Sequence, residues 1–201
     1  MYTAYVAEGI GTFVLSFVVL STLSYGAAFP IIVPVVAALT LALFVYTIGS
    51  FSGCHINPSV TLAQFSIGKI SAKDAAVYIV AQFVGALLAL LLSKFFGAVS
   101  PLTPEAFNFH LFAAEFVGAT FFNFGIAAVV LGKVEKQMSG VVVGGSLLLG
   151  ILTAVALGAA GILNPAVALT LNSFSVVYVL GPVLGAVLGA QVYKFLAQGK
   201  W

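Results

Sequence analysis

Two short stretches of this chain decide its fold. The first reads Ser52-Gly-Cys-His-Ile-Asn-Pro-Ser-Val-Thr-Leu-Ala-Gln-Phe-Ser66, and the second reads Gly158-Ala-Ala-Gly-Ile-Leu-Asn-Pro-Ala-Val-Ala-Leu-Thr-Leu-Asn-Ser173. Asn is a preferred helix N-cap, and Pro suits the first helical position because its missing N–H would be unpaired there anyway. One Asn–Pro pair is an ordinary loop dipeptide. Two pairs at matched positions of a repeat predict two helix starts.

The first of these helices is too short to cross a membrane. From Asn57 to Ser66 is ten residues, or about 15 Å of helix, which is half of a hydrocarbon core about 30 Å thick. Irregular backbone at that depth is tolerated only where it lines a cavity or is buried in protein. Two half-helices that enter from opposite faces and meet at the centre would therefore line a pore.

Composition places the rest of the chain in lipid. Of 201 residues, 62% are apolar and 6% are charged, and the mean hydropathy is +1.23. A soluble domain needs about a quarter of its residues charged. The scattered lysines and the net charge of +2 do not suggest nucleic acid. Six segments have the length of a membrane span, at 4–24, 32–50, 74–97, 110–131, 139–160 and 176–197.

An internal repeat relates the two halves. Ala7–Glu8 recurs as Ala114–Glu115, and Asn57–Pro58 recurs as Asn164–Pro165, both at an offset of 107. The later pair Gly85–Ala86 recurs at an offset of 100, and we assign the difference of seven to a loop, 68–74, that the second half lacks. We expect one channel domain, 1–201, with repeats at about 1–98 and 108–201. Three spans in each half make the second half inverted.

Lysine placement predicts the orientation in the membrane. With both termini cytoplasmic, only Lys94 lies outside, and this agrees with the positive-inside rule. The lysines then placed inside are Lys69, Lys73, Lys133, Lys136, Lys194 and Lys200.

Over essentially its whole length the chain resembles the aquaporin family, also called major intrinsic proteins. The resemblance rests on Ala7–Glu8, residues 52–61, Gln82 with Gly85–Ala86, Ala114–Glu115, Asn164–Pro165–Ala166, and Gly181–Pro182 with Gly185. It implies an all-α membrane protein with six transmembrane helices and two re-entrant half-helices in an inverted three-plus-three repeat. It also implies a homotetramer in membrane lipid, with one passive pore per subunit for water or small neutral solutes. The central pore residues would be Asn57, Pro58, Ser59, Asn164, Pro165 and Ala166.

The chain departs from the pattern of water-selective members at the outer filter. Those members carry an Arg directly after the second motif, whereas this chain has Val167 there and no Arg anywhere. Counting from the motifs places Ala37, Gly161 and one residue near 151–153, taken as Leu152, at the other filter positions. We expect a wider, apolar mouth that admits solutes larger than water, such as glycerol-like polyols.

The central Asn side chains suggest how ions are excluded. Each side-chain oxygen can accept from its own helix start, which leaves amide N–H groups to donate into the lumen. A water that accepts from Asn57 and Asn164 together could not also accept from its neighbours, so a proton-conducting chain would be interrupted. Facing helix N-termini add positive potential and repel cations.

Two carboxylates lie inside predicted spans. Glu8 and Glu115 could form a proton relay, but their repeat symmetry favours acceptance of hydrogen bonds from the re-entrant loops. His55, two residues before Asn57, is expected to brace the same loop, and gating by its protonation is the alternative.

Two other function classes stay open. A secondary transporter also uses inverted repeats and broken helices, although it normally needs ion-coordinating groups at its substrate site. A structural membrane protein on the same fold is the second alternative. We find no catalytic motif and no metal-ligand cluster, and His110 has no His or Cys near it in the sequence. We therefore expect neither an enzyme nor a bound metal or cofactor.

Overall fold

The computed structural model describes residues 2–25, 31–103 and 106–199. Within them every element is helical, and six helices are long and apolar enough to cross a membrane. Each predicted span corresponds to one of them within a few residues, so the predicted fold class is confirmed. Their bounds are α1 (Tyr2–Tyr25), α2 (Ile32–Ser52), α4 (Ala72–Phe95), α5 (Phe109–Val130), α6 (Ser139–Ala156) and α8 (Val176–Gln198). The short elements are α3 (Pro58–Ser66), the 3₁₀ turn η1 (Lys136–Met138) and α7 (Pro165–Thr170).

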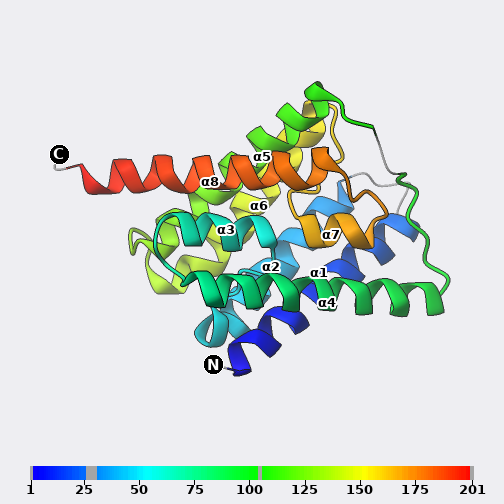
Figure 1. Cartoon of the computed structure of the whole chain (residues 1–201), viewed down its shortest axis with the longest axis horizontal. Coiled ribbons are helices and arrows are strands. Elements are labelled where there is room, and N and C mark those ends of the chain that lie inside the picture. Colours follow the sequence, from blue (N-terminus) through cyan, green and yellow to red (C-terminus); the bar gives the residue numbers. More distant parts are fainter. Residues whose placement is uncertain (1, 26–30, 104–105, 200–201) are drawn as a thin grey trace.

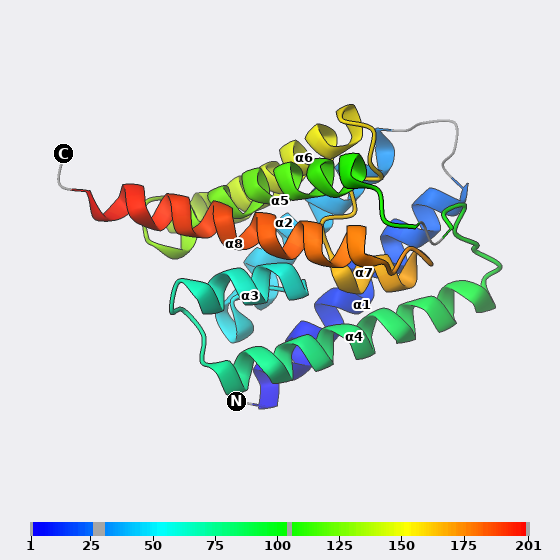
Figure 2. The same cartoon turned by 45° about the horizontal axis from the view of Figure 1, so that its top comes forward.

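Helices α4 and α8 run along the longest axis of the molecule, the other long helices run obliquely to it, and α3 and α7 lie between α4 and α8 (Figure 1). Helix α1 begins and α8 ends at the same end of the bundle, which we call the terminal end; the other is the far end. A second view shows α3 extending from the middle toward the terminal end and α7 extending toward the far end (Figure 2). The two short helices therefore point away from each other, with their N-termini at the centre.

Glycines allow the tightest helix pairs. A Cβ added at Gly85 on α4 would meet the carbonyl oxygen of Gly9 on α1, and one at Gly185 on α8 would meet that of Phe116 on α5. Small residues at such crossings let the two helix backbones approach closely. This close packing favours helix association in a membrane, where the hydrophobic effect does not, because lipid tails are as apolar as the helix surfaces. The equivalent crossings α1–α4 and α5–α8 hold each half together.

We had assigned the seven-residue difference between the halves to a loop that the second half lacks. The structure shows instead that the difference lies in two helices. Helix α3 has nine residues and α7 has six. Helix α4 begins 13 residues before Gly85, whereas α8 begins nine residues before Gly185. One turn is therefore absent from the short helix and another from the following span, and the connecting turns keep the same length. As a result α7 reaches about 4.5 Å less far from the centre than α3.

Candidate pore at the two Asn–Pro helices

Both Asn residues cap the helices that follow them. The side-chain oxygen of Asn57 accepts from the N–H of Ser59 at 2.8 Å, and that of Asn164 accepts from the N–H of Ala166 at 3.0 Å. Both Asn backbones are extended, and each helix starts with Pro. These caps satisfy backbone donors that the start of any helix leaves unpaired.

The same two side chains join the halves. The Nδ2 of Asn57 donates to the carbonyl of Leu163 at 2.9 Å, and the Nδ2 of Asn164 donates to the carbonyl of Ile56 at 3.1 Å. The residue before each Asn thus accepts from the Asn of the other half. One N–H of each amide is used in this way, so one N–H of each remains to face a passing molecule.

The loops before the two Asn share an uncommon backbone shape. Ile56 and Leu163 have φ of 39° and 53°, and Cys54 and Gly161, one repeat apart, have φ of 54° and 69°. Left-handed backbone costs a non-glycine residue roughly 1–2 kcal/mol. This conformation therefore needs compensating partners.

Glu115 supplies those partners in the second half. Its carboxylate accepts three backbone N–H groups, from Gly161 at 2.7 Å, Ile162 at 3.0 Å and Leu163 at 2.8 Å. The side chain is fully buried. A buried carboxylate is tolerated when several donors surround it. All three donors come from the loop that positions Asn164.

Glu8 has the same place in the first half with a different set of donors. It accepts from the N–H of His55 at 2.9 Å and of Ile56 at 2.6 Å. The Ser52 hydroxyl and the Gln82 amide complete its surroundings at 2.6 and 2.8 Å. Side chains from α2 and α4 thus take the place of the third backbone donor.

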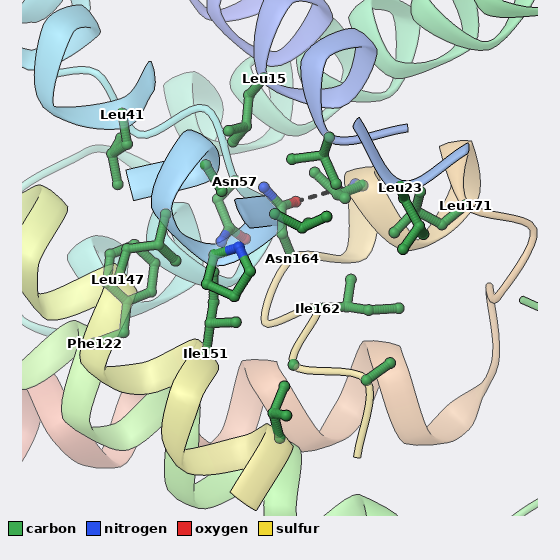
Figure 3. A pocket seen from close by; sticks show the side chains of 18 of the residues that line it. Leu15, Leu23, Leu41, Asn57, Phe122, Leu147, Ile151, Ile162, Asn164 and Leu171 are labelled. Carbon is green, nitrogen blue, oxygen red and sulfur yellow. Dashed lines mark hydrogen bonds between the residues drawn. The ribbon is translucent and has the colours of Figure 1, made fainter. Parts of the chain in front are cut away.

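A cavity of about 360 Å³ adjoins the two caps. Its polar side chains are those of His55, Asn57 and Asn164, and the other described residues that line it are apolar or glycine. They come from α1, α2, α5, α6 and α7, from the loops before the short helices, and from the α4–α5 connection. The close view shows both Asn side chains in the middle, between Leu41 and Leu147 on one side and Leu23 and Leu171 on the other (Figure 3).

Three of the four predicted filter positions, Ala37, Gly161 and Val167, line this cavity. Gly161 has no room for a side chain, because a Cβ would lie 2.9 Å from the Ile151 carbonyl oxygen. Leu152, the fourth predicted position, does not line the cavity and is 37% exposed on the outside of α6, so the structure does not bring it together with the other three.

The α6 residues that line the cavity include Ile151 and Val155, which lie four apart and so share one helix face. Together with Leu147 they form an i, i+4, i+8 row that could have been recognised in the sequence. This row could not be found by counting residues from an Asn–Pro motif in another segment. The motif residues Pro58, Ser59, Pro165 and Ala166 are buried but do not line the cavity, because they form the helix starts.

His55 lies at the first loop and also lines the cavity. Its ring Nδ1 is 3.2 Å from the Thr61 hydroxyl, and its ring meets Tyr78 edge to face with centroids 5.2 Å apart. Neither of these two partners carries a charge that would stabilise a protonated ring.

The outward ends of the short helices are held differently in the two halves. At the end of α3, Gln191 donates to the carbonyl of Ser66 at 2.8 Å and Lys194 to that of Ile67 at 3.3 Å. At the end of α7, the hydroxyl of Ser100 donates to the carbonyl of Leu171 at 2.7 Å. Each bond satisfies a carbonyl left over at a helix end.

Six apolar helices around a cavity with capped half-helices at its centre define a multi-pass integral membrane protein with an internal cavity. A sequence model of the family described as "Major intrinsic protein" matches residues 1–193. The chain therefore belongs to the major intrinsic protein family, whose members are channels rather than enzymes.

Individual relatives agree with that family. Nodulin-26 of Glycine max is 32% identical over 95% of this chain and 76% of its own length. Aquaporin AqpM of Methanothermobacter thermautotrophicus is 30% identical over 78% of this chain and 72% of its own, and aquaporin NIP1-2 of Arabidopsis thaliana is 29% identical over 82% and 62%. The aquaglyceroporin structure from Plasmodium falciparum superposes with a TM-score of 0.74 over 98% of this chain and 96% of that one, at 20% identity, and supports the fold.

Proposed function

We propose that water and small neutral solutes cross the membrane passively through the cavity beside Asn57 and Asn164. The observation that carries this proposal is the pair of cap amides, each bonded to its own helix and to the opposite loop, at the middle of a mostly apolar cavity whose other polar side chain among the described residues is His55. A permeant meets two fixed donors at one place, and apolar walls elsewhere bind it too weakly to retain it.

Selectivity in this proposal depends on size and hydration rather than on a fixed charge. No Lys, Asp or Glu among the described residues lines the cavity, and the chain has no Arg. The passage stays wide at the predicted filter positions, because Ala37, Gly161 and Val167 have small side chains or none. Neutral solutes larger than water, of the size of glycerol, therefore pass.

Cations and protons are excluded at the centre. The two short helices direct the positive ends of their dipoles at this point, which disfavours a cation. A water that accepts from the free N–H of both Asn57 and Asn164 has its own hydrogens directed outward on both sides. It therefore cannot relay a proton along the file of waters.

The channel is oriented with both termini in the cytoplasm and assembles as a homotetramer in lipid, each subunit with its own passage. Lysine placement supports the orientation, because Lys69, Lys73, Lys133, Lys136 and Lys194 belong to the terminal end of the bundle and Lys94 to the far end. Lys200 lies outside the described residues. Family resemblance supports the tetramer.

The alternative of a coupled transporter is disfavoured by the carboxylates. Glu8 and Glu115 accept hydrogen bonds from the loops and line no part of the cavity, so neither is placed to couple an ion to a substrate. A purely structural role would not require the cavity or the side-chain amide donors of Asn57 and Asn164 that line it.

Stopped-flow light scattering on proteoliposomes tests the proposal. Water and glycerol gradients are applied in turn to vesicles with the parent chain, to vesicles with an equal amount of Asn164→Leu, and to empty vesicles. The parent should accelerate both water and glycerol equilibration above empty vesicles, and the variant should not. Rates equal to those of empty vesicles would exclude a channel, and fast water flux without glycerol flux would exclude the wide mouth.

A further inference from the structure

Part of the cavity lining comes from three leucines that no motif marks. Leu23 from α1, Leu102 from the α4–α5 connection and Leu171 from the end of α7 all line it. Figure 3 shows Leu23 and Leu171 together, on the side of Asn164 away from Leu147. None of these three residues, which we call the leucine entrance, is a predicted filter position.

Two hydrogen bonds bring the connection to this place. The N–H of Val99 donates to the hydroxyl of Ser24 at 3.0 Å, which ties the connection to the end of α1 beside Leu23. The hydroxyl of Ser100 donates to the carbonyl of Leu171 at 2.7 Å and accepts from the N–H of Leu102 at 3.1 Å. Ser100 thus links two of the three leucines directly.

The shortness of α7 explains why the connection can reach the cavity. This helix is one turn shorter than α3, so its last carbonyls lie deeper in the bundle. In the first half the corresponding carbonyls are bonded by Gln191 and Lys194 of α8. In the second half Ser100 of the connection provides a bond, and Leu102 follows it inward.

We propose that Leu23, Leu102 and Leu171 form the specificity-determining entrance of the channel, with Leu102 positioned by Ser100. An apolar lining disfavours ions, because nothing on it replaces the hydration shell that an ion would lose. This chain has no filter Arg, so the entrance selects by size and by the cost of dehydrating a charge. Small neutral solutes pass, and the leucine side chains limit their size. The inference rests on the proposed channel function and deepens it.

A cysteine placed at the entrance tests the proposal. Leu102→Cys is compared with Thr103→Cys, its exposed neighbour that does not line the cavity. Both are compared with the parent, whose sole cysteine, Cys54, is 5% exposed. A negatively charged methanethiosulfonate is present on both sides of the proteoliposome membrane. It should reduce water and glycerol flux about fivefold or more in Leu102→Cys only.

A second variant asks whether the leucine itself sets selectivity. Leu102→Ala should raise glycerol permeability relative to water by about two- to threefold, because it widens the entrance without adding a charge. Equal sensitivity of Leu102→Cys and Thr103→Cys to the reagent, or an unchanged glycerol-to-water ratio in Leu102→Ala, would overturn the leucine entrance while the channel function stands. Parent vesicles without flux would overturn the channel function itself, and the entrance with it.

Discussion

Glu8 and Glu115 lie at equivalent positions in the two halves, and each carboxylate accepts the backbone N–H groups of the two residues directly before an Asn–Pro pair. The loops they hold contain left-handed residues. An amide in place of either carboxylate would offer one acceptor oxygen instead of two and would bring its own N–H donors against the backbone N–H donors. The position of each central Asn therefore depends on a carboxylate from a spanning helix.

The first prediction concerns these carboxylates. Glu115→Gln should lower the free energy of unfolding by about 2–4 kcal/mol, because at least one buried N–H loses its acceptor, and it should abolish flux. Thermal unfolding in detergent and stopped-flow scattering measure the two effects. Glu135→Gln, at an exposed position of the 131–138 connection, is the control and should change neither. Parent-like stability and flux in Glu115→Gln would contradict the bracing role.

The second prediction separates capping from permeation. Asn164→Leu removes a helix cap and the bond to Ile56 and should cost about 2 kcal/mol; it should also stop water flux, because a central donor is lost. Asn108→Ala removes the cap of α5, whose side chain accepts from the N–H of His110 and of Leu111. It should cost about 1 kcal/mol and leave flux intact. Equal flux in the two variants would argue against a central role for Asn164.

The third prediction concerns a positive charge introduced at the outer mouth. Val167 is 5% exposed and lines the cavity, so Val167→Arg should place a guanidinium there. We expect glycerol permeability to fall about tenfold or more, which corresponds to about 1.4 kcal/mol in barrier height, while water still passes. Val167→Met, of similar length without charge, is the control and should reduce glycerol flux less. An unchanged ratio of glycerol to water flux in Val167→Arg would show that the mouth lies elsewhere.

The fourth prediction concerns pH. The contacts described for the His55 ring are the Thr61 hydroxyl and the edge of the Tyr78 ring, and neither carries a charge that would stabilise a protonated ring. Flux should therefore stay constant between about pH 5.5 and pH 8. Water permeability measured across this range tests the expectation, with His55→Gln alongside. A titration between pH 5.5 and 7 that disappears in His55→Gln would instead support gating by this histidine.

The fifth prediction concerns the outward end of α3. Lys194→Met should reduce the free energy of unfolding by about 1 kcal/mol or more, because the carbonyl of Ile67 loses a charged donor. Lys94→Met at the equivalent position of α4 is the matched control, since Lys94 is exposed and the structure gives it no such bond within the described residues. Equal destabilisation of the two variants in thermal unfolding would mean that the bond to Ile67 contributes little.

Much of the fold could be read from the sequence because lipid imposes simple constraints. A span must be long and apolar, so the six helices were predicted within a few residues. The two Asn–Pro pairs predicted helix starts, since capping is a local property of Asn and of the residues that follow it. The inverted relation of the halves follows from three spans in each.

Tertiary structure alone decided what surrounds those helix starts. The bond from Asn57 to Leu163 joins residues 106 apart, and Leu102 reaches the cavity only because α7 is short and Ser100 bonds its end. Leu152 lies outside the cavity because the rotation of α6, and not distance from a motif, determines which side chains face inward. Local patterns set where helices begin and end, whereas the lining of a passage depends on how distant helices rotate and pack against one another.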